Sequence, residues 1–159
     1  LLVDIFQISS VDAGLRTAGF VVVATFARPI GGYLADRFGG HVILNWVFAV
    51  TMGTAVTLAF YTSFWPVTVA SLTLAMAAGV GNGAVFKLVP QYYPKHTGVV
   101  TGIAGAAGGI GGFFPPLVMG VVRQEFGAYF VGFLLLALFA AGCWFLNVRK
   151  TNALTTTEV

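Results

Sequence analysis

The chain is poor in charged residues, and this shortage excludes more protein classes than any motif does. Only 8% of its 159 residues are charged, against roughly 25% in a soluble domain. Eight basic and five acidic side chains cannot cover a globule of this size, so lipid must surround most of its surface. The composition excludes a soluble domain, a disordered chain and a nucleic-acid-binding protein, since the net charge of +3 comes from scattered residues.

Cysteine and clusters of reactive side chains are also scarce. The single Cys143 cannot form an internal disulfide, which excludes a disulfide-rich secreted domain. Neither His41 nor His96 has metal-ligand spacing to another histidine, cysteine or acidic residue, so we expect both to be solvated loop residues. No arrangement of Ser, His and Asp, or of Cys and His, indicates nucleophilic catalysis. We therefore expect no enzyme activity, no catalytic residues, no metal and no cofactor.

Long apolar runs are what the sequence has in abundance, with 58% hydrophobic residues. A helix needs about 20 apolar residues to cross a bilayer core of about 30 Å, and five runs are long enough. Segments such as FVGFLLLALFAAGC do not alternate as the strands of a membrane barrel would. The sequence therefore predicts an all-α polytopic membrane bundle with five transmembrane helices, at Thr17–Ala35, Val42–Tyr61, Phe64–Phe86, Thr97–Val122 and Phe126–Val148.

The segments outside these runs indicate how the chain is organised. Residues 1–148 are expected to form the membrane part and residues 149–159 a disordered tail. Leu1–Ile8 reads as the end of an earlier helix, so we expect the chain to be part of a longer membrane protein. The DRFGGH loop, the PKHT loop and the tail carry four Lys or Arg residues, against two at the other ends. The positive-inside rule then predicts a cytoplasmic C-terminus.

Arg28 is the most informative single residue, because it is a charge inside an apolar span. It lies eight residues before Asp36, or about 12 Å into the membrane at 1.5 Å per residue. A charge near the midplane costs about 2.5–3.5 kcal/mol even on the lenient insertion scale. No acidic residue lies within the five spans. The partner of Arg28 is therefore either a structural group elsewhere in the protein or a transported anion, and we favour the anion.

Two further polar residues lie in the span that begins at Phe64. Asn82, among three glycines, is a buried polar group that needs a partner, which an anion or a facing helix could supply. Lys87 precedes Pro90, where we expect the helix to end. A lysine in a last turn interacts favourably with the helix dipole and can extend its amine to the interface. The alternative is that Lys87 lines an anion path.

The span Thr97–Val122 carries a stripe of glycines. Gly102, Gly105, Gly109 and Gly112 are spaced three, four and three residues apart, so they share one helix face, and Gly108 and Gly111 lie beside them. Such a face permits close helix packing. It could equally leave a groove for a small ligand, for which we name Gly105, Gly108, Gly109 and Gly112.

The decapeptide GGYLADRFGG (residues 31–40) combines small residues with an Asp-Arg pair at a helix end. An ordinary tight turn would explain it, but it also closely resembles the loop signature of the major facilitator superfamily. In that interpretation Gly32, Asp36, Arg37 and Gly40 belong to a gating loop, and Asp36 faces the positive N-terminus of a neighbouring helix in one conformation only.

The combination of FARPIGGYLADRFGG, AGVGNGAVFKLVPQYYPK and the glycine pattern of Thr101–Phe114 resembles the C-terminal half of the nitrate/nitrite porters of that superfamily. The resemblance covers most of residues 3–147. It implies helices eight to twelve of a twelve-helix fold, with Arg28 matching the family's anion-binding arginine of helix eight. The matching arginine and glycine signature of the first half have no counterpart in this chain.

The resemblance implies nitrate or nitrite transport by alternating access in the plasma (inner) membrane, with lipid and an N-terminal half as partners. Nitrate is a planar monoanion, which a planar guanidinium can contact through two parallel N–H donors. Two alternatives remain open. One is a transporter of another small anion such as a carboxylate, and the other is a membrane module in which Arg28 and the glycines only pack helices.

Overall fold

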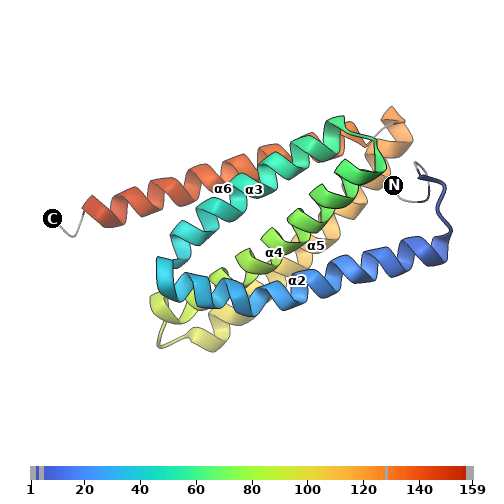
Figure 1. Ribbon diagram of the computed structural model, residues 1–159. Helices are drawn as coiled ribbons and strands as arrows, with labels where there is room; N and C mark the ends of the chain where they lie inside the picture. The colour runs from blue at the N-terminus through green and yellow to red at the C-terminus, as the bar shows by residue number, and fades with distance from the viewer. Residues whose placement is uncertain (1–2, 4–5, 128, 157–159) are drawn as a thin grey trace.

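The computed structural model describes residues 3, 6–127 and 129–156, with the side chains of residues 114, 116, 126 and 152–156 left undescribed. Five long helices joined by short connections make up almost all of this part of the chain (Figure 1). All five are long and apolar enough to cross a membrane, which confirms the predicted all-α membrane bundle. They are α2 (Ser10–Phe38), α3 (Gly40–Phe60), α4 (Phe64–Tyr92), α5 (Thr97–Phe126) and α6 (Phe130–Thr156).

Each of the five helices extends past its predicted apolar run at one end or both, although α6 begins at Phe130, later than its predicted start at Phe126. Helix α2 begins at Ser10, because the Ser9 hydroxyl oxygen caps it by accepting a hydrogen bond from the Asp12 backbone N–H at 3.1 Å. Helix α4 continues through Pro90 to Tyr92, so the expected end at the proline is wrong. Proline keeps a helical φ but has no N–H to donate to the Phe86 carbonyl, so α4 continues with one backbone hydrogen bond fewer at this turn.

The C-terminal helix also passes its expected boundary. Helix α6 continues through Arg149 and Lys150 to Thr156, where a disordered tail was expected. The division into a membrane part and a tail stays a prediction. Residues 157–159, and most of the segment Leu1–Ile8 expected to end an earlier helix, lie outside the described residues.

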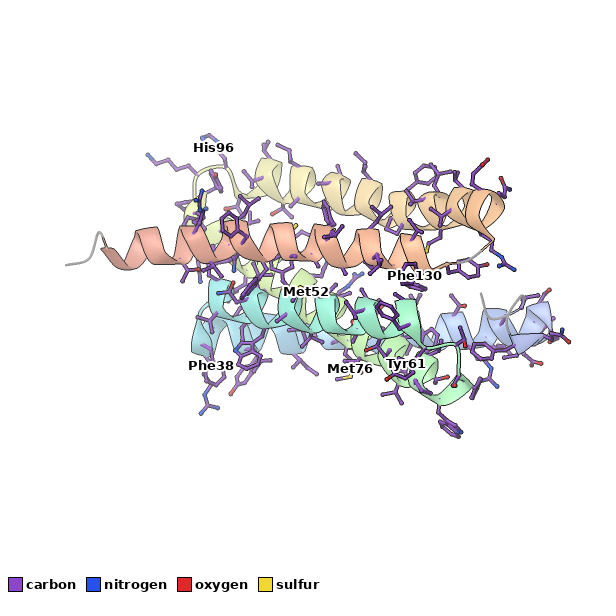
Figure 2. All side chains as sticks on the ribbon, turned by 90° about the horizontal axis from the view of Figure 1, so that it is seen from above. Phe38, Met52, Tyr61, Met76, His96 and Phe130 are labelled. Carbon is purple, nitrogen blue, oxygen red and sulfur yellow. The ribbon has the colours of Figure 1, made fainter. Side chains whose placement is uncertain are left out.

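The connections gather at two opposite ends of the bundle. The α2–α3 turn, the α4–α5 loop and the end of α6 lie together, and the α3–α4 and α5–α6 connections lie at the other end (Figure 1). Phe38 and His96 accordingly lie at one end, and Tyr61 and Phe130 at the other (Figure 2). We call the first the basic end, because it carries Arg37, Lys95, Arg149 and Lys150.

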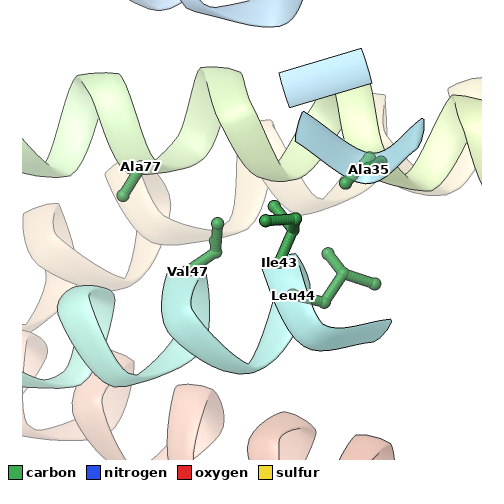
Figure 3. Close-up of a cluster of buried hydrophobic side chains, with 6 residues drawn as sticks. Ala35, Ile43, Leu44, Val47 and Ala77 are labelled. Atoms are coloured by element: carbon green, nitrogen blue, oxygen red, sulfur yellow. The ribbon is translucent and has the colours of Figure 1, made fainter. Parts of the chain in front are cut away.

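Small and aliphatic side chains form the packed centre. Helix α2 packs mainly against α4, and α3 packs against both α4 and α6, whereas α5 makes few contacts. Lipid is as apolar as these side chains, so close van der Waals packing has to hold the helices together. The main buried cluster joins α2, α3 and α4 (Figure 3), and it consists of Ala35, Ile43, Leu44, Val47, Ala77 and Ala84.

A single glycine makes the turn between α2 and α3. Gly39 has a φ of +90° and donates its N–H to the Ala35 carbonyl at 3.0 Å. A Cβ on the following Gly40 would lie 2.5 Å from Leu88 Cγ, so a larger residue here would have to displace the Leu88 side chain. The expected gating loop is therefore shorter than its motif, because Asp36 and Arg37 belong to α2, as Gly32 does, and Gly40 begins α3.

Candidate functional site

Glycines bring the backbones of α2 and α4 into direct contact. A Cβ added to Gly79 would overlap the carbonyl oxygen of Ala24, and one added to Gly31 would overlap that of Val80. A Cβ on Gly83 would overlap the carbonyl oxygen of Arg28 and lie 2.8 Å from the Gly32 nitrogen. The close approach expected of the small residues in the decapeptide is therefore present, and its partner is α4.

This contact fixes the surroundings of Arg28. The residue is exposed on α2, although its backbone lies against Gly83. The described part of the chain offers its guanidinium no hydrogen-bond or ion-pair partner. A cation deep in a membrane span is costly unless it is paired or hydrated. Its partner is therefore water, a group outside the described residues or a bound anion.

Asn82 lies next to that contact on α4. It precedes Gly83, so the crossing of α2 and α4 brings Asn82 and Arg28 to a similar depth. The amide is half-buried and has no hydrogen-bond partner among the described residues. Arg28 and Asn82 are thus two polar groups that have no partner within the described part of the chain, and neighbouring helices place them near one depth.

The glycine stripe of α5 lies apart from this pair. A Cβ added to Gly102, Gly105, Gly108, Gly109 or Gly112 would meet nothing within 4 Å. The stripe therefore does not pack against any helix in the described part of the chain. Helix α5 makes only limited contacts, with α4 and α6, and no extensive α2–α5 packing joins the glycines to Arg28.

Asp36 and Lys87 form an ion pair that sequence reasoning missed. Lys87 Nζ lies 2.9 Å from Asp36 Oδ2, and the two side chains are 42% and 49% exposed. The pair joins α2 to α4 toward the basic end, beyond the contact between Gly83 and Arg28. The sequence predicts separate roles for the two residues, with Lys87 as a lysine in a last turn or along an anion path and Asp36 as an aspartate facing a helix N-terminus. The glycines of α2 and α4 were the sequence signal that could have predicted this pair, because they indicate that the two helices pack closely.

His41 corrects a second expectation. It lies in α3 and is half-buried, not a solvated loop residue. Its Nδ1 is 2.7 Å from Asn147 Oδ1, and its Nε2 is 2.7 Å from the Tyr92 hydroxyl. The amide of Asn147 also donates to the Asn45 oxygen at 2.8 Å. Polar side chains from α3, α4 and α6 therefore bond to one another at the basic end, as buried polar groups must. His96 is exposed beside α5, as expected.

Comparison with known proteins agrees with this architecture. The model of the Major Facilitator Superfamily matches residues 1–158. The chain belongs to the Major Facilitator Superfamily. Its five helices and the decapeptide turn between α2 and α3 agree with that membership. No solved structure matches the chain.

Curated relatives carry nitrate and nitrite in their names. The chain is 48% identical over 136 residues to the nitrite extrusion protein of Bacillus subtilis, covering 86% of this chain and 34% of that protein. It is 44% identical over 138 residues to the probable nitrate transporter NarT of Staphylococcus haemolyticus, covering 87% and 36%. The NarT of Staphylococcus carnosus matches with the same identity and coverage. The resemblance predicted from the motifs is confirmed, and the chain spans about a third of the relatives' length.

Proposed function

We propose that this chain is part of a transporter of nitrate or nitrite, and that Arg28 binds the anion. The observation that carries the proposal is an arginine inside a membrane span with no partner in the described residues. Two parallel N–H donors of a guanidinium match two oxygens of a planar oxoanion. Binding an anion would offset part of the cost of placing the cation in the membrane.

Asn82 and the glycines of α5 complete the proposed site on this side. Asn82 can donate a hydrogen bond to an anion oxygen from α4, close to the depth of Arg28. One face of α5 has no side chains, because it consists of Gly105, Gly108, Gly109 and Gly112. This face could leave space beside the anion, or it could let another helix approach closely. The wall opposite these residues would come from the N-terminal half, since the chain spans about a third of its relatives.

The pair of Asp36 and Lys87 is the proposed gate. Its 2.9 Å contact holds the ends of α2 and α4 together, and its half-exposed position makes it easy to break. Gly32, Arg37 and Gly40 belong to the same motif, and Gly39 makes the turn. When the pair opens, Lys87 becomes a cation along the anion path. In this arrangement the basic end and the C-terminus face the cytoplasm, and the protein lies in the plasma (inner) membrane.

Substitution of Arg28 in the full-length protein tests the proposal. Arg28→Lys keeps the charge but loses the paired donors, so uptake of labelled nitrate into proteoliposomes should fall at least tenfold at unchanged expression. Arg16→Lys, at the opposite end of α2, is the matched control and should leave uptake unchanged. Wild-type uptake by Arg28→Lys would remove Arg28 from the site.

The choice of anion separates the alternatives. Nitrate should raise the unfolding temperature of the purified protein more than formate does, and Arg28→Lys should abolish the difference. A larger effect of formate would indicate a carboxylate transporter. Stabilisation by neither anion would indicate a module in which Arg28 and the glycines only pack helices.

A further inference from the structure

Among the described residues, the basic end carries positive charge that acidic side chains do not balance. Among the described acidic residues, only Asp36 lies at this end, and it already pairs with Lys87. The others, Asp12 and Glu125, lie at the start of α2 and the end of α5, which is the opposite end. No described acidic side chain is therefore left to neutralise Arg37, Lys95, Arg149 and Lys150.

Two of these cations are held in place by aromatic rings, not by acids. Arg149 Cζ lies 4.6 Å from the centre of the Phe145 ring, and Lys150 Nζ lies 4.6 Å from the centre of the Tyr92 ring. The Tyr92 hydroxyl is in turn bonded to His41 Nε2 at 2.7 Å. Such contacts position a cation without neutralising it, so both side chains keep their charge for an anion from outside.

The surface directly before these cations on α6 is apolar. Trp144, Phe145 and Leu146 are exposed, with Leu146 as much as 68% exposed. An apolar helix surface that ends in exposed basic residues matches a ligand with a hydrocarbon part and an anionic head. A soluble anion such as free phosphate would use only the cations and gain nothing from the apolar residues.

We propose that the basic end of α4 and α6 binds the headgroup of an anionic phospholipid, with Arg149 and Lys150 contacting its phosphate. Clusters of four or more basic residues at the ends of membrane helices are attracted to anionic lipid. Here Tyr92 and Phe145 set the position of the two cations, and the acyl chains lie along Phe145 and Leu146. This site is independent of Arg28 and of the transported anion.

Lipid binding to the purified full-length protein tests the proposal. Native mass spectrometry should show more bound phosphatidylglycerol than phosphatidylcholine, and the double variant Arg149→Gln with Lys150→Gln should weaken phosphatidylglycerol binding about 25-fold, or about fivefold per charge. Phosphatidylcholine binding should not change. Arg16→Gln is the matched control, since Arg16 lies 5.2 Å from the Phe64 ring centre at the opposite end, and it should bind phosphatidylglycerol normally.

Three results would overturn the site. The first is wild-type phosphatidylglycerol binding by the double variant, and the second is an equal loss in the Arg16 variant, which would mean that any surface charge suffices. The third is that inorganic phosphate, at an ionic strength matched with chloride, displaces the lipid and raises the unfolding temperature as much as phosphatidylglycerol does. An unchanged unfolding temperature of the double variant in phosphatidylcholine shows that it remains folded.

Discussion

Gly83→Ala is the substitution for which the structure predicts the largest effect from the smallest change. The added Cβ would overlap the carbonyl oxygen of Arg28 and lie 3.0 Å from the Arg28 carbonyl carbon and 2.8 Å from the Gly32 nitrogen. All these atoms belong to the backbone of α2, so no side chain can turn away. The helices must separate by about 0.6 Å to restore ordinary contact with Gly32 alone.

The size of the effect follows from two opposing contributions. Alanine is about 1 kcal/mol better than glycine inside a helix, while forcing an extra methyl group into a packed contact costs about 1–3 kcal/mol. Gly53 on α3 provides the matched control, because a Cβ there meets nothing within 4 Å. Gly53→Ala should keep only the helical gain. The unfolding temperature of Gly83→Ala should then lie about 2–3 °C below that of Gly53→Ala, because about 2 kcal/mol is divided by an unfolding entropy of about 2.1 cal/mol/K per residue in a protein about three times as long as this chain.

Thermal unfolding of the purified full-length variants, followed by fluorescence-detected gel filtration, measures this difference. Labelled nitrate uptake adds a second measurement, because a shift of α2 moves Arg28 relative to Asn82. A displacement near 1 Å can cost about 100-fold in a positioned site, so uptake should fall at least tenfold in Gly83→Ala and stay normal in Gly53→Ala. If Gly83→Ala is as stable as Gly53→Ala, α2 and α4 do not meet through their backbones.

Three further predictions concern the gate, the glycine stripe and the polar cluster. Asp36→Asn and Lys87→Met should each increase the labelling of cysteine residues by a reagent added at the basic end. The loss of stability should stay under about 1 kcal/mol, because the pair is half-exposed. Exchanging the two residues should restore low labelling, and unchanged labelling in the single variants would indicate a plain surface pair. Gly109→Leu should abolish uptake in the full-length protein, although a Cβ at Gly109 meets no described atom within 4 Å, and normal uptake would show that the face is not used. Asn147→Leu should lower the free energy of unfolding by about 1–3 kcal/mol, because it removes the hydrogen-bond partner of His41 Nδ1 and of the Asn45 side-chain oxygen. Asn82→Leu should cost little stability and reduce uptake, and equal stability losses in the two variants would place Asn82 in the packing instead.

The sequence by itself determined the class of the protein and the approximate position of every helix. Charge is too scarce for water to solvate the surface, and only helices of about 20 apolar residues satisfy every backbone group in lipid. The charge of Arg28 was equally visible, because a cation inside an apolar run stands out whatever its neighbours are. Helix ends were less certain, since Pro90 and the basic residues after Val148 lie inside helices.

Only the tertiary structure decided which residues meet. The ion pair between Asp36 and Lys87 depends on the parallel packing of α2 and α4, and its two residues are 51 positions apart. The bond from His41 to Asn147 spans 106 positions, so no local pattern distinguishes that histidine from one in a loop. The glycines show the same limit, because those of α4 contact α2 while the similarly spaced ones of α5 face open space. Spacing places small residues on one helix face, but the presence of a partner on that face depends on how the helices pack.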